Sequence, residues 1–167
     1  METDVTKILD EFGIKYVIKE HQNPAFACED VARERNVRLA QVLKCMVGKD
    51  INKNVYIMLI PGDKILKIKK LRHITGGIKI DLFSPKDLSD SFNIIVGAIS
   101  PIQFLKNARF YIDETVLLED IVDISSGSPN AGVQLKTRDL VNFIKPTLCD
   151  IISSNSGIRS LALHKDN

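Results

Sequence analysis

The chain has 167 residues, of which 44% are apolar and 26% are charged, and its formal net charge is +2. This composition is ordinary for a soluble globular protein, and the length suits a sizeable core, so we expect residues 1–167 to form a single domain. The net charge is too small to indicate tight nucleic-acid binding by itself, although charges can segregate onto one face.

The cysteines and the N-terminal segment argue against several classes of protein: disulfide-linked, metal-binding, secreted and membrane-spanning. Cys28, Cys45 and Cys149 are far apart, with no CxxC or Cys/His spacing, which predicts neither a disulfide framework nor a metal site. The N-terminal segment METDVTKILDEF is polar and acidic, unlike a signal peptide, and the longest apolar run is far short of a membrane span. We therefore expect a cytoplasmic protein with no membrane partner. No glycine-rich nucleotide loop or Walker sequence is present, so no cofactor is expected.

In chain order, hydrophobic periodicity predicts short helices and short strands that alternate. Thr3 or Asp4 can cap the first helix, and Ser84 followed by Pro85 is a typical helix start. The expected helices span about 3–12, 29–35, 64–74, 85–92 and 137–145, the last capped by Thr137. The expected strands span 15–20, 41–47, 55–60, 78–83, 93–96, 109–113, 121–125 and 133–135. This order indicates an α/β or α+β protein with a mixed sheet.

The segment Val96–Pro101 ends an apolar run, Ile94–Val96, that is typical of a buried strand. Gly97 permits a positive φ or a close approach of backbone to a ligand, and Pro101 stiffens the loop. A stiff loop with backbone N–H groups can hold an oxygen that gains negative charge. An ordinary tight turn explains the same residues.

Lys44 lies inside an apolar strand, on the face opposite Leu43 and Cys45. A lysine among such neighbours must reach water, pair with an acid or serve a site. It is also consistent with an outward edge-strand lysine that blocks aggregation.

Other polar residues have two interpretations each. His21 follows a strand and can be a surface or a site residue, and Asp113 can cap a helix or turn. Ser126 and Gly127 can form a polar wall or a hairpin turn. One dense basic cluster is either a solvated helix face or a phosphate-contacting patch; its members are Lys64, Lys67, Lys69, Lys70, Arg72 and His73. No nucleophile–base pair or triad is evident.

The order and spacing of these motifs resemble one known family. The segments that carry the resemblance are His21, Glu29–Ala32, Gln41–Lys44, Ile60–Asp63, Lys69–Leu71, Val96–Pro101, Tyr111–Glu114 and Ser126–Gly127. Together they resemble the YbaK/ProX family of aminoacyl-tRNA deacylases, which is related to the editing insertion of bacterial prolyl-tRNA synthetases. The resemblance runs from about Ile8 to Ile151.

This resemblance implies an α/β fold with a mixed, partly barrel-like sheet surrounded by helices. It implies a free-standing enzyme that hydrolyses the ester between a wrong amino acid and the 3′-terminal ribose of tRNA, without a metal or a side-chain nucleophile. Lys44 would contact the 3′-terminal adenosine or phosphate, backbone amides of the motif that contains Gly97, Ala98 and Ser100 would hold the oxyanion, and Pro101 would keep the loop rigid. Substrate-binding positions would be His21, Cys28, Asp113, Ser126 and Gly127, and tRNA-binding positions Lys67, Lys69 and Lys70. The partners implied are the acceptor end of a mischarged tRNA and an aminoacyl-tRNA synthetase.

The chain departs from the family pattern around the expected pocket rim. Ala98 and Gln103 stand where glycines are common, Lys67 where aspartate is common, and Cys28 where threonine is common. The 126–132 turn lacks the usual Gly-Arg-Arg-Gly character. We therefore assign no amino acid, and a catalytically silent module that binds a tRNA end or a synthetase remains the alternative.

Overall fold

The computed structural model describes residues 1–95 and 97–154. These residues form a mixed α/β fold with five α-helices, three short 3₁₀-helices and two sheets. In chain order the elements are α1 (Asp4–Glu11), β1 (Val17–Glu20), α2 (Cys28–Arg35), η1 (Leu39–Gln41), β2 (Leu43–Lys49), β3 (Val55–Pro61), α3 (Ile68–Ile74), β4 (Asp81–Leu82), α4 (Pro85–Phe92), η2 (Pro101–Phe104), β5 (Ala108–Asp113), η3 (Glu114–Leu118), β6 (Ile121–Ser125), β7 (Ala131–Lys136), α5 (Thr137–Ile144) and β8 (Thr147–Cys149).

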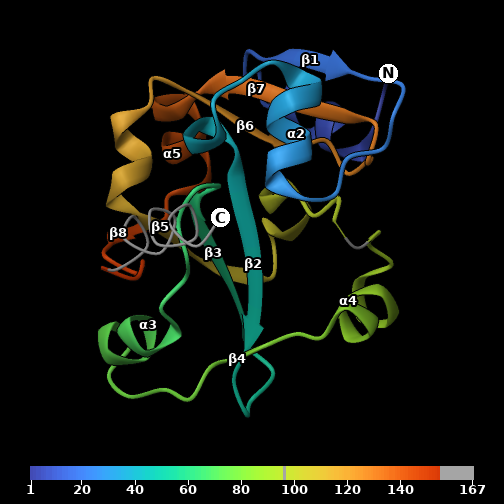
Figure 1. The fold of residues 1–167 in the computed structure, drawn as a ribbon. Helices are drawn as coiled ribbons and strands as arrows, with labels where there is room; N and C mark the ends of the chain where they lie inside the picture. Colours follow the sequence, from blue (N-terminus) through green and yellow to red (C-terminus); the bar gives the residue numbers. More distant parts are fainter. Residues whose placement is uncertain (96, 155–167) are drawn as a thin grey trace, which may run out of the picture.

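The larger sheet has the order β4-β2-β3-β5-β8, and the smaller has the order β1-β7-β6. In the larger sheet β2 and β3 are antiparallel, whereas β3, β5 and β8 run parallel. Strand β3 is apolar on both faces, and its residues from Tyr56 to Ile60 are at most 1% exposed, as expected for a central strand covered on both sides. Figure 1 shows β2 in the middle of the view, with α2 beside its start and α3 and α4 on either side of its end.

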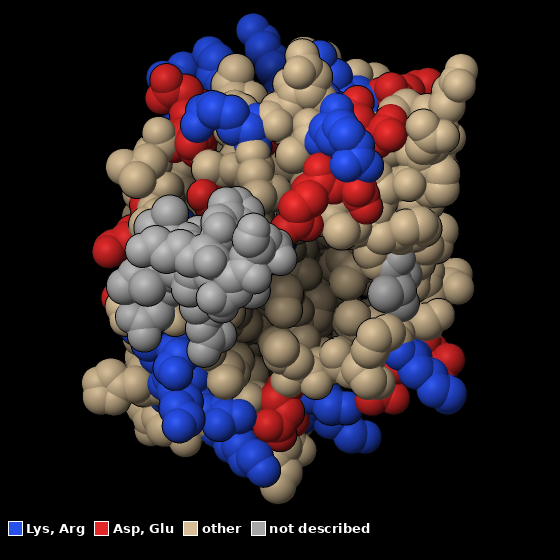
Figure 2. All heavy atoms as spheres, viewed as in Figure 1, with Lys and Arg blue, Asp and Glu red and all other residues tan. Residues whose placement is uncertain are grey.

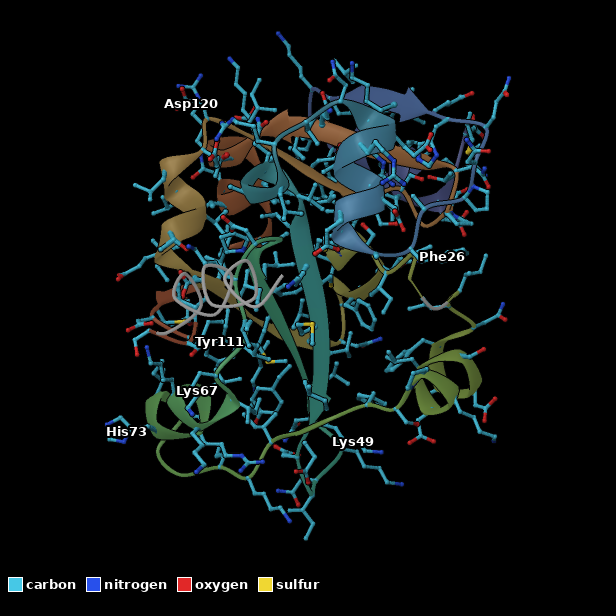
Figure 3. All side chains as sticks on the ribbon, viewed as in Figure 1. Phe26, Lys49, Lys67, His73, Tyr111 and Asp120 are labelled. Carbon is cyan, nitrogen blue, oxygen red and sulfur yellow. The ribbon has the colours of Figure 1, made fainter. Side chains whose placement is uncertain are left out.

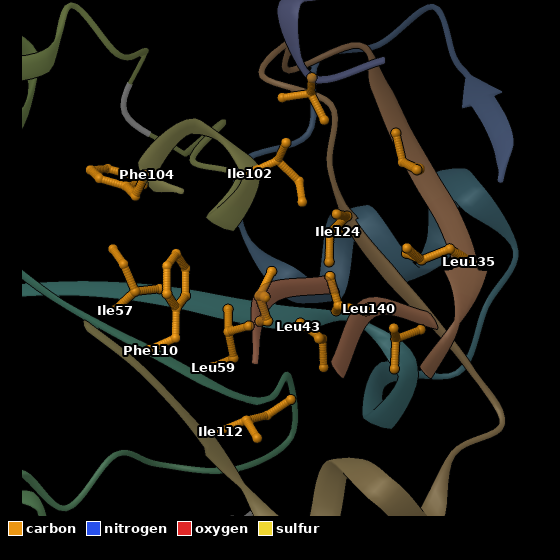
Figure 4. Close-up of a cluster of buried hydrophobic side chains, with 14 of the residues drawn as sticks. Leu43, Ile57, Leu59, Ile102, Phe104, Phe110, Ile112, Ile124, Leu135 and Leu140 are labelled. Carbon is orange, nitrogen blue, oxygen red and sulfur yellow. The ribbon is translucent and has the colours of Figure 1, made fainter. Parts of the chain in front are cut away.

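The two sheets meet where Val42, directly before β2, forms a parallel bridge with Asp123 of β6. The main hydrophobic core fills the space between the sheets, and Figure 4 shows Leu43 and Leu59 of the large sheet facing Ile124 and Leu135 of the small one. A second cluster on the other face of the large sheet packs Tyr56, Met58 and Ile60 beneath α3. The junction between the two sheets has the main core on one side and a partly unpaired edge of β2 on the other, which leaves room for a pocket.

Most expected elements are present, and the mixed sheet is confirmed, although the described residues form two sheets and no closed barrel. Thr3 caps α1 by accepting from the Thr6 N–H at 3.2 Å, and Ser84 caps α4 by accepting from the Asp87 N–H at 3.1 Å. Both caps satisfy backbone donors that the helix itself leaves unpaired.

Three predictions about elements were wrong, and one short strand was missed. Residues 93–95 form no strand, since Asn93 adopts the left-handed conformation that ends α4 and Ile95 is 54% exposed; Val96 lies outside the described residues. The strand expected at 78–83 is only Asp81–Leu82. Thr137 is not a cap, because its hydroxyl donates to the Glu119 carbonyl oxygen and Lys136 occupies the cap position. Strand β8 was not predicted, because it is short and its Thr147 and Leu148 are exposed.

Among residues 1–95 and 97–154 no helix is both long enough and apolar enough to cross a membrane.

Candidate active site

A small pocket of about 160 Å³ opens beside the junction of the two sheets, along the outer edge of β2. Its volume is below the range typical of sites for drug-sized ligands, so it suits a small group. Its walls come from α2 and the residues just before it, from β2 and the residue before it, from the segment after residue 96 and from β6. The lining residues are Phe26, Cys28, Val31, Arg35, Val42, Leu43, Lys44, Cys45, Met46, Gly97, Ile99, Asp123 and Ser125. Figure 2 shows the molecule hollowed over β2, with Asp and Glu side chains on the α2 side.

The pocket exists because strand pairing stops early on one side of β2. Strand β4 pairs with this edge only at Gly48 and Lys49, and the Phe83 N–H donates to the Val47 carbonyl oxygen at 3.0 Å. From Leu43 to Met46 the same edge has no strand partner among the described residues. Backbone and side chains of this stretch therefore face the pocket instead of a neighbouring strand.

Lys44 lines the pocket from β2, and its ammonium group is held at a fixed place. Its Nζ donates to the carbonyl oxygen of Lys64 at 2.7 Å. The loop that carries this carbonyl packs tightly, because a Cβ at Gly62 would lie 2.7 Å from the Leu39 carbonyl oxygen and 3.0 Å from that of Val42. Lys44 thus lines the pocket, and a backbone carbonyl oxygen accepts a hydrogen bond from its ammonium group.

Gly97 also lines the pocket, and only glycine fits there. Its φ of +86° is a conformation that L side chains rarely adopt. A Cβ at this position would also lie 2.5 Å from Cδ1 of Phe26. Figure 3 shows Phe26 on the segment that leads into α2. The positive φ expected at Gly97 is therefore present, and its backbone also lies close to an aromatic ring.

Of the other described residues of the glycine–proline motif, Ile99 lines the pocket, whereas Ala98, Ser100 and Pro101 do not. The Ala98 N–H donates to the Ile95 carbonyl oxygen at 2.9 Å, and the Ser100 N–H donates to Gln103 Oε1 at 2.8 Å. Ser100 is buried, and its Oγ is the buried side-chain polar atom without a hydrogen-bond partner in the described part of the chain. Pro101 is buried and begins η2. In this conformation two of the motif's amides already have acceptors.

One face of α2 supplies the wall beside β2. Cys28, Val31 and Arg35 are spaced by three and four residues, so their side chains lie on the same side of the helix. Burial raises the pKa of the Cys28 thiol, and the nearby charge of Lys44 opposes that increase. A thiol with a raised pKa is a weak nucleophile near neutral pH, which favours a packing role for Cys28.

Arg35 and Asp123 form a buried ion pair at the inner end of the pocket, with side chains 3% and 1% exposed. Sequence reasoning missed both residues. Asp123 is a carboxylate within the apolar strand Ile121–Ser125, and the argument applied to Lys44 would have found it. Burial raises the pKa of the Asp123 carboxyl group, and the charge of Arg35 opposes this. His21 contacts this ion pair, because its Nε2 accepts from Arg35 Nε at 3.3 Å. His21 itself does not line the pocket.

Three predicted substrate-binding residues lie outside the pocket lining and form turns. Asp113 is buried and accepts from the N–H groups of Thr115 at 3.0 Å and Ile151 at 2.9 Å. The Ser126 hydroxyl donates to the Ala131 carbonyl oxygen at 2.8 Å, and Gly127 has a φ of +88° in the same turn. These contacts match the structural interpretations of a cap and a hairpin turn.

The predicted tRNA-binding lysines lie at α3. Lys67 and Lys69 are exposed, whereas Lys70 forms an ion pair with Asp150 at 2.9 Å. Figure 3 places Lys67 at the start of α3 and His73 near its end, and Figure 2 shows Lys and Arg side chains gathered over this helix. Within the described ranges, no three His, Cys, Asp or Glu side chains are grouped as metal ligands.

Comparison with known proteins places this pocket within a family. Among curated proteins, the chain is 25% identical over 146 residues to the multifunctional Ser/Thr-tRNA deacylase ProXp-y of Escherichia coli (strain K12), covering 84% of this chain and 86% of that protein. It is 26% identical over 106 residues to a proline–tRNA ligase of Bacillus cereus (strain AH187), covering 64% of this chain and 18% of the ligase.

A solved structure of the hypothetical protein APE2540 has the same fold, with a TM-score of 0.84 at 22% identity, covering 90% of this chain and all of that one. The family model for the aminoacyl-tRNA editing domain matches residues 22–143. This span includes every residue that lines the pocket. The chain belongs to the aminoacyl-tRNA editing domain family.

Proposed function

We propose that this protein is a free-standing aminoacyl-tRNA deacylase, which hydrolyses the ester that joins a wrong amino acid to the 3′-terminal ribose of tRNA. The observation that carries the proposal is that Lys44 and Gly97, 53 positions apart in the sequence, line the same small pocket. These are the two positions that the family resemblance connects with substrate positioning and with the reacting carbonyl group.

The proposed reaction is the attack of water on the ester carbonyl carbon. The bond between this carbon and the ribose oxygen breaks, and one proton of the water goes to the ribose oxygen. The amino acid leaves as a carboxylate, and the second proton of the water is released to solvent. An aminoacyl ester is already activated, so positioning and oxyanion stabilisation can supply most of the rate increase. Lys44 would contact the 3′-terminal adenosine or its phosphate, and the backbone at Gly97 would face the carbonyl oxygen.

The acceptor stem would extend from the pocket over α3. Lys44 donates to the carbonyl oxygen of Lys64, which lies four residues before the start of α3, so the pocket and the basic helix adjoin. The exposed side chains of Lys67 and Lys69 are available to phosphates. Such contacts release counterions, so we expect tRNA affinity to fall as salt concentration rises. The match to a segment of a proline–tRNA ligase supports a synthetase as a second partner.

The test is a deacylation assay on a panel of misacylated tRNAs. We expect at least one ester to be hydrolysed and the Lys44→Ala variant to lose about 10²-fold or more in rate, as for removal of a positioning group. Lys19→Ala is the matched control, because Lys19 is an exposed strand lysine of the smaller sheet. Full activity in Lys44→Ala would contradict the assignment of Lys44.

A second candidate function is a catalytically silent module that binds a tRNA end or a synthetase. The engagement of the Ala98 and Ser100 amides within their own loop favours it, because neither amide is directed to an oxyanion in this conformation. Saturable binding of misacylated tRNA with no hydrolysis anywhere in the panel would support this function and contradict the first.

A further inference from the structure

The inner end of the pocket contains a buried carboxylate, which is ion-paired with Arg35. Asp123 is the carboxylate among the described residues that line the pocket, and it is almost completely buried. Arg35 holds it from one side through Nη1 to Oδ1, and Gln134 donates through Nε2 to Oδ2 at 3.3 Å. An ionised carboxylate has about four acceptor positions. Two therefore remain after these contacts.

Arg35 keeps the carboxylate in place instead of serving as the ligand-binding group itself. Its Nη2 donates to the Ala131 carbonyl oxygen at 3.1 Å, and its Nε lies 3.3 Å from His21 Nε2. A Cβ at Gly132 would lie 2.1 Å from Arg35 Nη1, so the guanidinium group lies directly on the backbone of β7. With all three nitrogens in contact, Arg35 is a positioning residue for Asp123.

The ends of the pocket differ in a way that orients an aminoacyl ester. Gly97 and Phe26 at the mouth are exposed, whereas Val42, Arg35 and Asp123 at the inner end are buried. With the ester carbonyl beside Gly97, the amino acid itself must occupy the inner part. An aminoacyl ester carries a protonated α-amino group, and a buried cation requires an anionic partner.

We propose that Asp123, held by Arg35, binds the α-ammonium group of the aminoacyl ester. This inference rests on the proposed function and deepens it, because it defines the substrate class as esters with an unmodified α-amino group. Esters of 2-hydroxy acids, which replace the ammonium group by a neutral hydroxyl of similar size, are then poor substrates. N-acylated esters are poor substrates for the same reason and also for their bulk.

The test compares two tRNA esters that differ only in this group: the aminoacyl ester that is hydrolysed fastest in the panel and its 2-hydroxyacyl counterpart. Each rate is divided by the spontaneous hydrolysis rate of the same ester, because the ammonium group itself activates the carbonyl. We expect the wild-type protein to prefer the aminoacyl ester about 10- to 100-fold in kcat/KM, the usual size of a charge-assisted hydrogen bond. Equal normalised rates would overturn the inference and leave the proposed function intact.

The Asp123→Asn variant tests the residue. We expect the preference to fall to within about threefold of one, whereas the exposed-site control Asp120→Asn keeps the wild-type preference. An Asp123→Asn variant that folds and keeps the full preference would contradict the role of Asp123.

A binding measurement on the wild-type protein requires neither a variant that folds nor a substrate that is hydrolysed. The probes are stable amide analogues, 3′-aminoacylamino-3′-deoxyadenosine and its 2-hydroxyacyl form. We expect the first to bind about 10- to 100-fold more tightly. Equal affinities would refute the inference even if the panel shows no hydrolysis, whereas a preference without hydrolysis would support it and contradict only the deacylase activity.

Discussion

The ring of Phe26 occupies the space that a side chain at residue 97 would need, since a Cβ built at Gly97 would lie 2.5 Å from Cδ1 of Phe26. The positive φ of Gly97 and this contact are separate constraints on the same residue. They fix the mouth of the pocket, because Phe26 belongs to one wall and Gly97 to the other.

Replacement of Gly97 by alanine should damage the site more than the fold. We expect Gly97→Ala to lower the deacylation rate about 10²-fold, because a displacement of about 1 Å at a reacting group has that effect. The control is Gly76→Ala, since Gly76 has a similar φ of +79° with no atom within 4 Å of an added Cβ. Both variants should lose about 1–2 kcal/mol of unfolding free energy from φ strain. Equal activity in the two variants would show that the Phe26 contact has no effect on the site.

Replacement of Gly62 by alanine should act on Lys44 from a distance. A Cβ at Gly62 would overlap backbone oxygens, so the loop must shift and move the Lys64 carbonyl that accepts from Lys44. We expect kcat to fall by about 10-fold or more while the protein stays folded, measured by single-turnover deacylation and thermal unfolding. The control is Gly77→Ala, where an added Cβ meets no atom within 4 Å. Unchanged kcat in Gly62→Ala would show that the function of Lys44 does not depend on the position of this loop.

The buried pair of Arg35 and Asp123 should be sensitive to loss of one partner. Arg35→Met leaves the Asp123 carboxylate buried without its counterion, and we expect a loss of about 3–5 kcal/mol of unfolding free energy. The double variant Arg35→Met/Asp123→Leu removes both charges, and it should be more stable than the single variant. Urea unfolding measures both. A double variant less stable than Arg35→Met would contradict the uncompensated-charge argument.

Asp50 should give the fold part of its acid sensitivity. The Asn54 side-chain amide, the Tyr56 hydroxyl and nearby backbone N–H groups donate to Asp50 and lower its pKa, and burial only partly opposes them. A carboxyl group whose pKa is lowered by folding stabilises the fold above its unfolded-state pKa of about 3.9, and this stabilisation is lost as pH falls through the lower folded-state pKa.

The measurable consequence is a pH-dependent difference between Asp50→Asn and wild type. We expect the variant to be less stable at pH 7 and the difference to shrink as pH falls below about 4. The exposed Asp63→Asn is the control. A difference that stays constant from pH 7 to pH 2 would show that the loss is not electrostatic.

Local patterns were enough for most of the fold. The Thr3 and Ser84 caps and the continuous apolar run of β3 specify their elements directly, because the signals are contained in a few neighbouring residues. The failures have tertiary causes. Ile94 and Ile95 have strand-like side chains, but Asn93 turns the chain after α4 and only Ile94 enters the core.

Part of the candidate site could also be predicted from local sequence patterns. Lys44 was conspicuous because an apolar strand surrounds it, and Gly97 because a strand-like run and a proline flank it. The partnership of Arg35 with Asp123 joins residues 88 positions apart, and no local signal connects them. Asp113 and Ser126 showed the opposite limit, because a polar residue at a strand end has the same local pattern whether it caps a turn or faces a pocket.

The pocket has walls from both sheets, since β2 contributes Lys44 and β6 contributes Asp123. A ligand bound there would therefore contact both sheets at their junction, where Val42 and Asp123 form the backbone bridge. Its binding free energy adds to the stability of that junction, so saturating substrate raises the melting temperature. Amide hydrogen exchange should slow most in β2 and β6, and protection there would report occupancy independently of any chemistry.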